Sequence, residues 1–182
     1  AEIPIHLPDN IEKNVYVWKA SANKTEKKIL EEGVKTRDKL RILLVNVESF
    51  ATAKVIKYLE AFIHRSNFML AVDESTTIKN IKAKRTKSVL KIGDSAQYKR
   101  ILTGSPITQS PMDLYAQCAF LDKDLLGFDS YWSFQGRYAI VRQTRMGNHS
   151  FQQVVGFRNL EELTDKLHNF AYRVTKEQAL DL

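Results

Sequence analysis

The segment Phe68-Met69-Leu70-Ala71-Val72-Asp73-Glu74-Ser75 decides the fold. Its first five residues are apolar without alternation, which is typical of a β-strand that is covered on both faces. The run then ends in two consecutive carboxylates. The segment therefore predicts a parallel sheet with an acidic pair at its carboxyl edge.

Similar runs lie on both sides of this segment, separated by stretches with helical spacing. Strands are expected at 15–18, 41–47 and 98–102, and helices at 25–33, 51–65 and 88–97. Strands that alternate with helices predict an α/β fold with right-handed crossovers. We expect further helices to begin at Ser110-Pro111 and at Asn159, the latter with a capping box.

The composition is enough for one good core, or for one domain with an appendage. The chain has 182 residues, of which 43% are hydrophobic and 27% charged. Its single cysteine, Cys118, lies in an apolar run and is expected to pack in the core, so an internal disulfide is excluded and a reducing compartment is favoured. No apolar run approaches the roughly 18 residues of a membrane span, so a soluble protein is expected.

Asp73 and Glu74 are the first candidates for chemistry. An apolar strand that ends in Asp-Glu is the pattern of a Walker B element, in which the Asp holds Mg²⁺ through water. The neighbouring Glu orients and deprotonates the water that attacks a γ-phosphate. The alternative is a solvated acidic pair that opens a loop.

The next strand ends in a second candidate segment, Thr103-Gly104-Ser105-Pro106. Small hydroxyl residues with Gly and Pro form a tight, rigid loop. Its hydroxyls can link a phosphate-sensing site to a bound nucleic-acid strand. The alternative is an ordinary turn from a strand into a helix.

Taken together and about 30 residues apart, these segments resemble motifs of the Swi/Snf-type ATPases of helicase superfamily two. Asp73–Asn80 resembles motif II and Ile101–Ile107 resembles motif III. Leu43–Phe50 is similar to motif Ib, and Tyr172–Glu177 resembles the segment that ends the first motor lobe. Asp113-Leu114-Tyr115 falls where the family has Glu-Leu-Tyr. All five agree in order and spacing.

The resemblance implies a RecA-like parallel sheet flanked by helices, as part of a P-loop NTPase lobe. Residues 1–122 would be the C-terminal part of the first lobe. Residues 123–158 would be a mostly helical, aromatic-rich insertion. The aromatic side chains between 128 and 157 are expected to form a satellite core, with base stacking as the alternative. Residues 159–182 would hold a closing helix and the link to a second lobe.

The implied function is part of an ATP-dependent DNA translocase or helicase, with ATP and Mg²⁺ as cofactors. Its implied partner is double-stranded DNA, which is bound independently of sequence, and no association with a membrane is expected. The long insertion and the stretch 156–163 resemble phage and bacterial members and the fork-remodelling branch more than chromatin remodellers. This implies a cytoplasmic, nucleoid-associated protein or a phage protein in the host cytoplasm. The alternative is a catalytically inactive nucleic-acid-binding or scaffold module derived from such a motor.

The sequence departs from the family pattern at informative positions. Ser75-Thr76 stand where Ala-His or Gly-His is usual, and Ser105 replaces a threonine. No Gly-x-x-x-x-Gly-Lys-Ser/Thr loop occurs in the 182 residues. We therefore expect the chain alone to be inactive. Without the strand that bears this loop, an apolar seam is expected to stay open in the sheet.

The net charge of +7 favours a polyanionic partner. Candidate DNA contacts, with a solvated loop as the alternative for the basic run, are Ser49, Lys79, Asn80, Lys82, Lys84, Arg85 and Lys87. Arg173 and Lys176 are expected to meet DNA or the second lobe, or else to complement a helix dipole.

Overall fold

The computed structural model describes residues 10–146, 149–175 and 177–178. Its elements, in chain order, are β1 (Lys13–Val17), α2 (Lys24–Lys35), β2 (Leu40–Leu44), η1 (Val47–Ala51), α3 (Ala53–Ile63), β3 (Met69–Val72), η2 (Ser75–Ile78), α4 (Lys84–Gly93), β4 (Tyr98–Ile101), η3 (Pro111–Asp113), α5 (Leu114–Leu121), α6 (Tyr131–Tyr138), β5 (Ala139–Met146), β6 (His149–Phe157) and α7 (Leu160–His168). None of the helices among these residues is both long and apolar enough to cross a bilayer.

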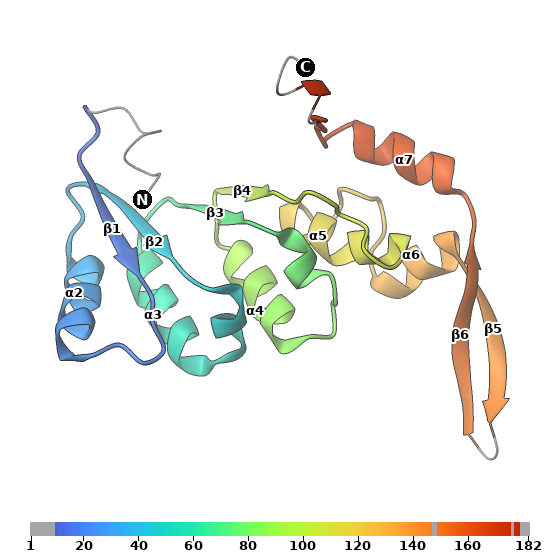
Figure 1. Cartoon of the computed structure of the whole chain (residues 1–182), viewed down its shortest axis with the longest axis horizontal. Coiled ribbons are helices and arrows are strands. Elements are labelled where there is room, and N and C mark those ends of the chain that lie inside the picture. The colour runs from blue at the N-terminus through green and yellow to red at the C-terminus, as the bar shows by residue number, and fades with distance from the viewer. Residues whose placement is uncertain (1–9, 147–148, 176, 179–182) are drawn as a thin grey trace.

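The four predicted strands are present as two parallel pairs. β1 pairs with β2 from Lys13 opposite Leu40 onward, and β3 pairs with β4 from Met69 opposite Tyr98 onward. Each strand is followed by a helical segment, as the alternation in the sequence predicted (Figure 1). The α/β class and the parallel strands are thus confirmed.

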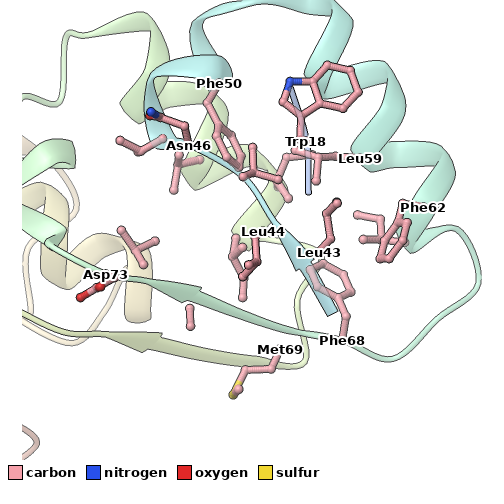
Figure 2. Close-up of a pocket in the computed structure, with 18 of the residues that line it drawn as sticks. Trp18, Leu43, Leu44, Asn46, Phe50, Leu59, Phe62, Phe68, Met69 and Asp73 are labelled. Carbon is pink, nitrogen blue, oxygen red and sulfur yellow. The ribbon is translucent and has the colours of Figure 1, made fainter. Parts of the chain in front are cut away.

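A cleft separates the two strand pairs. In the described part of the chain, β2 and β3 have no hydrogen bonds to each other, and a cavity of about 640 Å³ lies between them. Apolar side chains line it, including Leu43 from β2 and Leu70 from β3. Asp73 lies at one end of the cleft and Phe62 at the other (Figure 2). The structure therefore has the apolar seam that the sequence predicted.

In the described residues, helices cover one face of the strands and not the other. α2, α3 and α4 lie on the same side of β1–β4 (Figure 1), and on this side Tyr16 and Val72 are buried. Tyr16 packs so closely on α2 that a Cβ at Gly33 would lie 2.9 Å from its ring. Alternate residues point to the opposite face, where Val17 and Met69 are 50% and 61% exposed. Both faces are apolar in sequence, yet one lacks a covering layer.

A second core of aromatic residues forms beyond the strands. Phe134 and Tyr138 of α6 are fully buried, and Phe128 packs edge-on against both rings. Leu163 of α7 closes this core, whereas Trp132 is 60% exposed. The predicted satellite core is therefore present. α5 joins the two cores, because its Phe120 packs with the strands and its Cys118 with the aromatic cluster.

The expectation of a mostly helical insertion is wrong for its second half. Residues 139–146 and 149–157 form two long antiparallel strands, β5 and β6, with a register shift between Ile140 and Val141. Both faces of the hairpin are largely exposed, so its apolar residues follow no simple alternation. For this reason the period-2 signal of a strand was not visible.

Two helix starts also differ from the predictions. α4 begins at Lys84, four residues earlier than expected, so the basic run 84–87 is helical rather than a loop. Asn159 precedes α7, but its backbone is left-handed (φ 54°) and its side chain makes no cap bond. Its amide donates instead to the Arg137 carbonyl at 3.0 Å. A tertiary contact has replaced the predicted capping box.

Candidate functional site

The pairing of β3 with β4 brings the two candidate segments together. Val72 is opposite Ile101, and the Leu102 N–H donates to the Val72 carbonyl at 3.0 Å. One step further, the Ser75 N–H donates to the Leu102 carbonyl at 3.0 Å. Asp73-Glu74 and Thr103-Gly104-Ser105 therefore leave the same edge of the sheet on adjacent strands.

Asp73 and Glu74 are both exposed at the rim of the cleft. Neither carboxylate lies within 4.0 Å of a basic group in the described residues. Asp73 accepts a hydrogen bond from the Glu74 N–H at 3.0 Å. Glu74 has left-handed backbone angles (φ 48°, ψ 60°), which are rare for a non-glycine residue and concentrate at functional sites. The pair is free to bind a cation and a water molecule.

The loop after β4 is held by its own hydroxyl groups. The Ser105 N–H donates to Thr103 Oγ1 at 3.2 Å, and Ser105 Oγ donates to the Ile107 carbonyl at 3.0 Å. A Cβ added at Gly104 would meet no atom within 4 Å. The loop is therefore ordered from within and faces open space next to the carboxylates.

Gln117 of α5 ties the two loops together, a role that the sequence did not indicate. Its side chain is 1% exposed and accepts from Ser75 Oγ at 2.6 Å. Its amide Nε2 donates to the carbonyls of Pro106 and Asp113, both at 2.8 Å. Ser75, which replaces the usual small residue of the family pattern, is fully buried. One side chain thus connects the loop after β3, the loop after β4 and α5.

Asp113 forms a second connection between these loops. Its Oδ2 accepts from the N–H groups of Thr108 and Gln109 at 3.0 and 2.9 Å, and from the Thr108 hydroxyl at 2.9 Å. Lys79 Nζ lies 3.5 Å from the same oxygen. Burial alone would raise the pKa of the Asp113 carboxyl, but these hydrogen bonds and the ammonium group outweigh it and lower the pKa.

Glu48 and Arg85 connect the segment after β2 to α4. The Arg85 guanidinium lies 2.5 and 2.6 Å from the two carboxylate oxygens of Glu48, and it also donates to the Thr77 carbonyl at 2.9 Å. Ser49, the candidate in this segment, is half-buried and its carbonyl accepts from Thr52. Side chains therefore link the three segments that resemble motifs Ib, II and III.

The predicted DNA-contacting residues divide into two groups. Lys79 and Arg85 are engaged in the ion pairs with Asp113 and Glu48, so their contact with DNA stays a prediction. Lys82, Lys84 and Lys87 have no acidic partner within 4.0 Å among the described residues. Lys82 lies 5.1 Å from the centre of the Trp132 ring. The side chain of Asn80, by contrast, accepts from the Lys82 N–H.

The last two candidates are less informative. Arg173 lies in an irregular exposed segment after α7. Lys176 lies outside the described residues. Both roles stay predictions.

The residues present fit Mg²⁺ in part. The described residues contain no cluster of three His, Cys, Asp or Glu side chains that could hold a metal. Mg²⁺ is commonly bound through one or two carboxylates, with water and nucleotide phosphates as the other ligands. An exposed Asp73 beside an unpaired Glu74 fits that mode of binding.

Comparison with known proteins gives one consistent family. The family model described as "SNF2-related domain" matches residues 2–178. A "SWI/SNF-related matrix-associated actin-dependent regulator of chromatin subfamily A-like protein 1" of Drosophila melanogaster is 31% identical over 122 residues, which is 66% of this chain and 15% of that protein. Its Xenopus laevis namesake is 30% identical over 148 residues, 80% of this chain and 14% of that protein.

Two further proteins complete the comparison. The "TATA-binding protein-associated factor MOT1" of Saccharomyces cerevisiae is 32% identical over 123 residues, which is 66% of this chain and 6% of that protein. A solved structure described as "Sulfolobus solfataricus SWI2/SNF2 ATPase core in complex with dsDNA" has the same fold, with a TM-score of 0.56 at 23% identity. It is matched over 94% of this chain and 36% of that chain.

The chain thus spans only a small part of the curated relatives that it matches. Those named above are eukaryotic and give no support to the expectation of a phage or bacterial source.

Proposed function

The chain belongs to the SNF2-related domain family, and from that membership we propose that it is part of an ATP-driven motor that moves on double-stranded DNA. The observation that carries the proposal is the meeting of two segments at one sheet edge. Asp73-Glu74 and Thr103-Gly104-Ser105 end neighbouring parallel strands, the position at which α/β proteins bind their ligands.

The residues have distinct roles in this proposal. Asp73 holds Mg²⁺ through water, and Glu74 orients and deprotonates the attacking water. Bound Mg-ATP supplies the phosphoanhydride bond whose hydrolysis drives the motor. The Thr103–Ser105 loop transmits the state of this site, because Gln117 fixes it to the residue that follows Glu74.

The N-terminus of α4 supports the proposal of a DNA partner. Lys84, Arg85 and Lys87 lie in its first turns, and its N-cap Ala83 makes no side-chain cap bond. Positive charge at a helix N-terminus is unfavourable unless an anion neutralises it, and the free N–H groups there bind phosphate well. A DNA phosphate near Lys82, Lys84 and Lys87 meets both requirements. The archaeal neighbour is described as bound to double-stranded DNA.

Other polypeptide must contribute the phosphate-binding loop in this proposal. The 182 residues contain no Gly-x-x-x-x-Gly-Lys-Ser/Thr sequence, whose backbone and lysine cradle the phosphates of ATP. We therefore expect the isolated chain to hydrolyse ATP no faster than buffer in a coupled phosphate-release assay. A rapid, DNA-stimulated rate from the isolated chain would contradict this division of roles.

The decisive test uses the natural protein that contains this sequence. ATP turnover is measured with and without duplex DNA for the wild type, for Glu74→Gln and for the control Glu161→Gln, an exposed carboxylate on α7. Loss of the general base should lower the DNA-stimulated kcat by about 10²–10⁴-fold, while KM for ATP changes little. The control should keep wild-type turnover. Equal rates for Glu74→Gln and wild type would rule out the assignment.

A further inference from the structure

The β5–β6 hairpin is the most prominent feature that the motor site leaves unexplained. It joins residues 139–146 to residues 149–157 and extends away from the helices and strands (Figure 1). Arg142, Gln143, Gln152 and Gln153 are all exposed, so neither face of its outer part packs on the body. A two-stranded ribbon is marginally stable in water by itself. To remain ordered while it extends from the body, the hairpin needs stabilising contacts at its base. Its exposed far end is then available to bind a partner.

The anchor is provided by α6 and α7. Ala139 is buried in the aromatic core, and the Arg158 N–H donates to the Tyr138 carbonyl at 2.9 Å. The Arg158 guanidinium donates to the carbonyls of Gly136 and Arg137 at 2.6 and 3.2 Å. Glu162 of α7 accepts from the Tyr138 hydroxyl at 2.9 Å and pairs with Arg137. The direction in which the hairpin leaves the body is thus fixed by two helices.

The charge of the hairpin is of one sign. No Asp or Glu occurs from residue 130 to residue 160. Arg142 and Arg145 are exposed, and neither lies within 4.0 Å of a carboxylate in the described residues. Among the other exposed positions, Gln143, Gln152 and Gln153 supply hydrogen-bond donors. A surface of this kind attracts phosphate groups and repels cationic partners.

The dimensions match a duplex groove. Nine residues of strand extend for about 30 Å, and the major groove of B-DNA, about 12 Å wide, admits a two-stranded ribbon. Arg142 is opposite Gln153 and Arg145 is opposite Ser150. The two arginines are three residues apart and therefore lie on opposite faces of the ribbon. They can reach the phosphates on both sides of a groove.

We propose that the β5–β6 hairpin is a second DNA-binding element, which lies along a groove of double-stranded DNA and contacts its phosphates through Arg142 and Arg145. The proposal rests on the proposed function for its choice of polyanion. It adds a contact outside the motif segments, on the far side of the aromatic core from the strands. The contact is independent of sequence, because phosphates carry no base information.

Exposed apolar residues near the hairpin base define the competing outcome. Ile140, Val141 and Val155 are 46%, 38% and 46% exposed and would suit a protein partner. These three lie toward the anchored end, whereas Arg145 and the 45% exposed Phe151 lie toward the turn. An acid-free ribbon with outer arginines favours DNA as the occupant. Loss of hairpin function without loss of DNA affinity would favour a protein instead.

The first experiment measures how the 182-residue chain binds a labelled duplex as salt is varied from roughly 50 to 200 mM. Arg142→Gln/Arg145→Gln is compared with Lys24→Gln/Lys28→Gln, in which two exposed lysines of α2 are changed. Both double variants lower the formal charge from +7 to +5, since each removes two positive charges. Each phosphate contact contributes about 0.9 to the magnitude of the slope of log K against log salt concentration. Because the hairpin variant loses two contacts, the magnitude of its slope should fall by about 1.8.

Each result has a definite meaning. The α2 variant should keep the wild-type slope, and Arg142→Lys/Arg145→Lys should restore it, since a lysine also binds phosphate. Equal losses in the hairpin and α2 variants would reduce the proposal to a general charge effect and overturn it. If Lys82→Gln/Lys84→Gln/Lys87→Gln loses slope and the hairpin variant does not, the hairpin proposal fails and the proposed function stands. Failure of the wild-type chain to bind duplex would overturn the hairpin proposal as well.

A crosslink provides a second readout that does not depend on charge. Cys118 is the only cysteine, and burial raises the pKa of its thiol to about 12, so it is unreactive at neutral pH. A photoreactive group attached to Gln152→Cys should crosslink to duplex DNA, and one attached to Lys28→Cys on α2 should not. Equal crosslinking at both positions would count against a docked hairpin.

Discussion

Two regions of the molecule bury their apolar side chains in different ways. The strand region, β1–β4 with α2, α3 and α4, has apolar residues on both faces of its strands but helices on one face only. A cleft of about 640 Å³ also divides its two strand pairs. The aromatic region, α5–α7 with the hairpin base, encloses Phe134 and Tyr138 completely. In the described residues, the first region leaves apolar side chains exposed, whereas the second forms a closed core.

The comparison explains where the candidate chemistry lies. Asp73 lies at the rim of the cleft, and Thr103 follows the neighbouring strand β4, so both belong to the open region. The aromatic region contains Gln117 in α5 and Asp113 in η3. Their side chains form hydrogen bonds with the loop that follows β4 in the strand region. The closed core thus acts as a rigid support for an open one.

The largest effect should come from removing the centre of the closed core. Phe134→Ala should cost about 3–5 kcal/mol of stability, because it removes a fully buried ring and leaves a cavity. Hydrogen exchange should show faster opening of α6 and α7 than of α3. Trp132→Ala, on the same helix but 60% exposed, should cost less than about 1 kcal/mol. Equal acceleration of α3 and α6 would show that the two regions open as one unit.

A smaller effect should come from the link between the regions. Gln117→Ala leaves the Ser75 hydroxyl and two carbonyls without their partner, at a cost of about 2–3 kcal/mol. A double-mutant cycle with Ser75→Ala should give a coupling energy of about 0.5–3 kcal/mol, measured by urea unfolding. The exposed Gln97→Ala should change stability by less than about 0.5 kcal/mol. If the losses of unfolding free energy in Gln117→Ala and Ser75→Ala simply add in the double variant, the two side chains are not coupled and the proposed link is wrong.

The helical layer of the strand region can be tested at α2. Asn23 forms a capping box with Glu26, with bonds of 2.9 and 2.8 Å in the two directions. Asn23→Ala should therefore cost about 1 kcal/mol, with the loss seen as faster exchange in α2. Glu31→Ala, an exposed change in the same helix, serves as the control. No change with Asn23→Ala would mean that packing on β1 alone fixes this helix.

The pH dependence of the link should be the smallest effect. A carboxyl whose pKa is lowered on folding stabilises the fold above its unfolded pKa of about 3.9. For Asp113 this contribution is lost as the pH falls from about 4 through the lowered folded pKa. Asp113→Asn should flatten the loss of unfolding free energy between about pH 5 and pH 2. Thr108→Val, which removes one of its hydrogen bonds, should give an intermediate slope. Parallel curves for all three proteins would exclude this linkage.

The strands and the acidic corner could be predicted because local sequence determines them. The run 68–72 has no polar interruption, and Asp73 ends it where the strand ends. The sequence predicted an open apolar seam but not a cleft between β2 and β3. The periodicity of a strand shows how many of its faces are apolar, but it does not show whether another strand or helix packs against them. The hairpin was missed because solvent on both faces removes the alternation that marks a half-buried strand.

Contacts between distant residues lay beyond the sequence. Gln117 is 42 positions from Ser75, and nothing near either residue indicates that they meet. Asn159 matched the local pattern of a cap, but the Arg137 carbonyl, 22 positions earlier, takes its amide. Among the basic residues, the ion pairs of Lys79 and Arg85 depend on acids that are 34 and 37 positions away, so sequence alone could not separate them from Lys82, Lys84 and Lys87.

The left-handed backbone at Glu74 has a consequence for how this protein tolerates change. A φ of 48° suits glycine better than glutamate, because glycine has no Cβ, so the native residue holds the backbone in a less favourable conformation than glycine would. A library screened for heat tolerance should therefore enrich Glu74→Gly, and a library screened for turnover should discard it. At this one position, thermal stability and catalytic turnover therefore favour different residues.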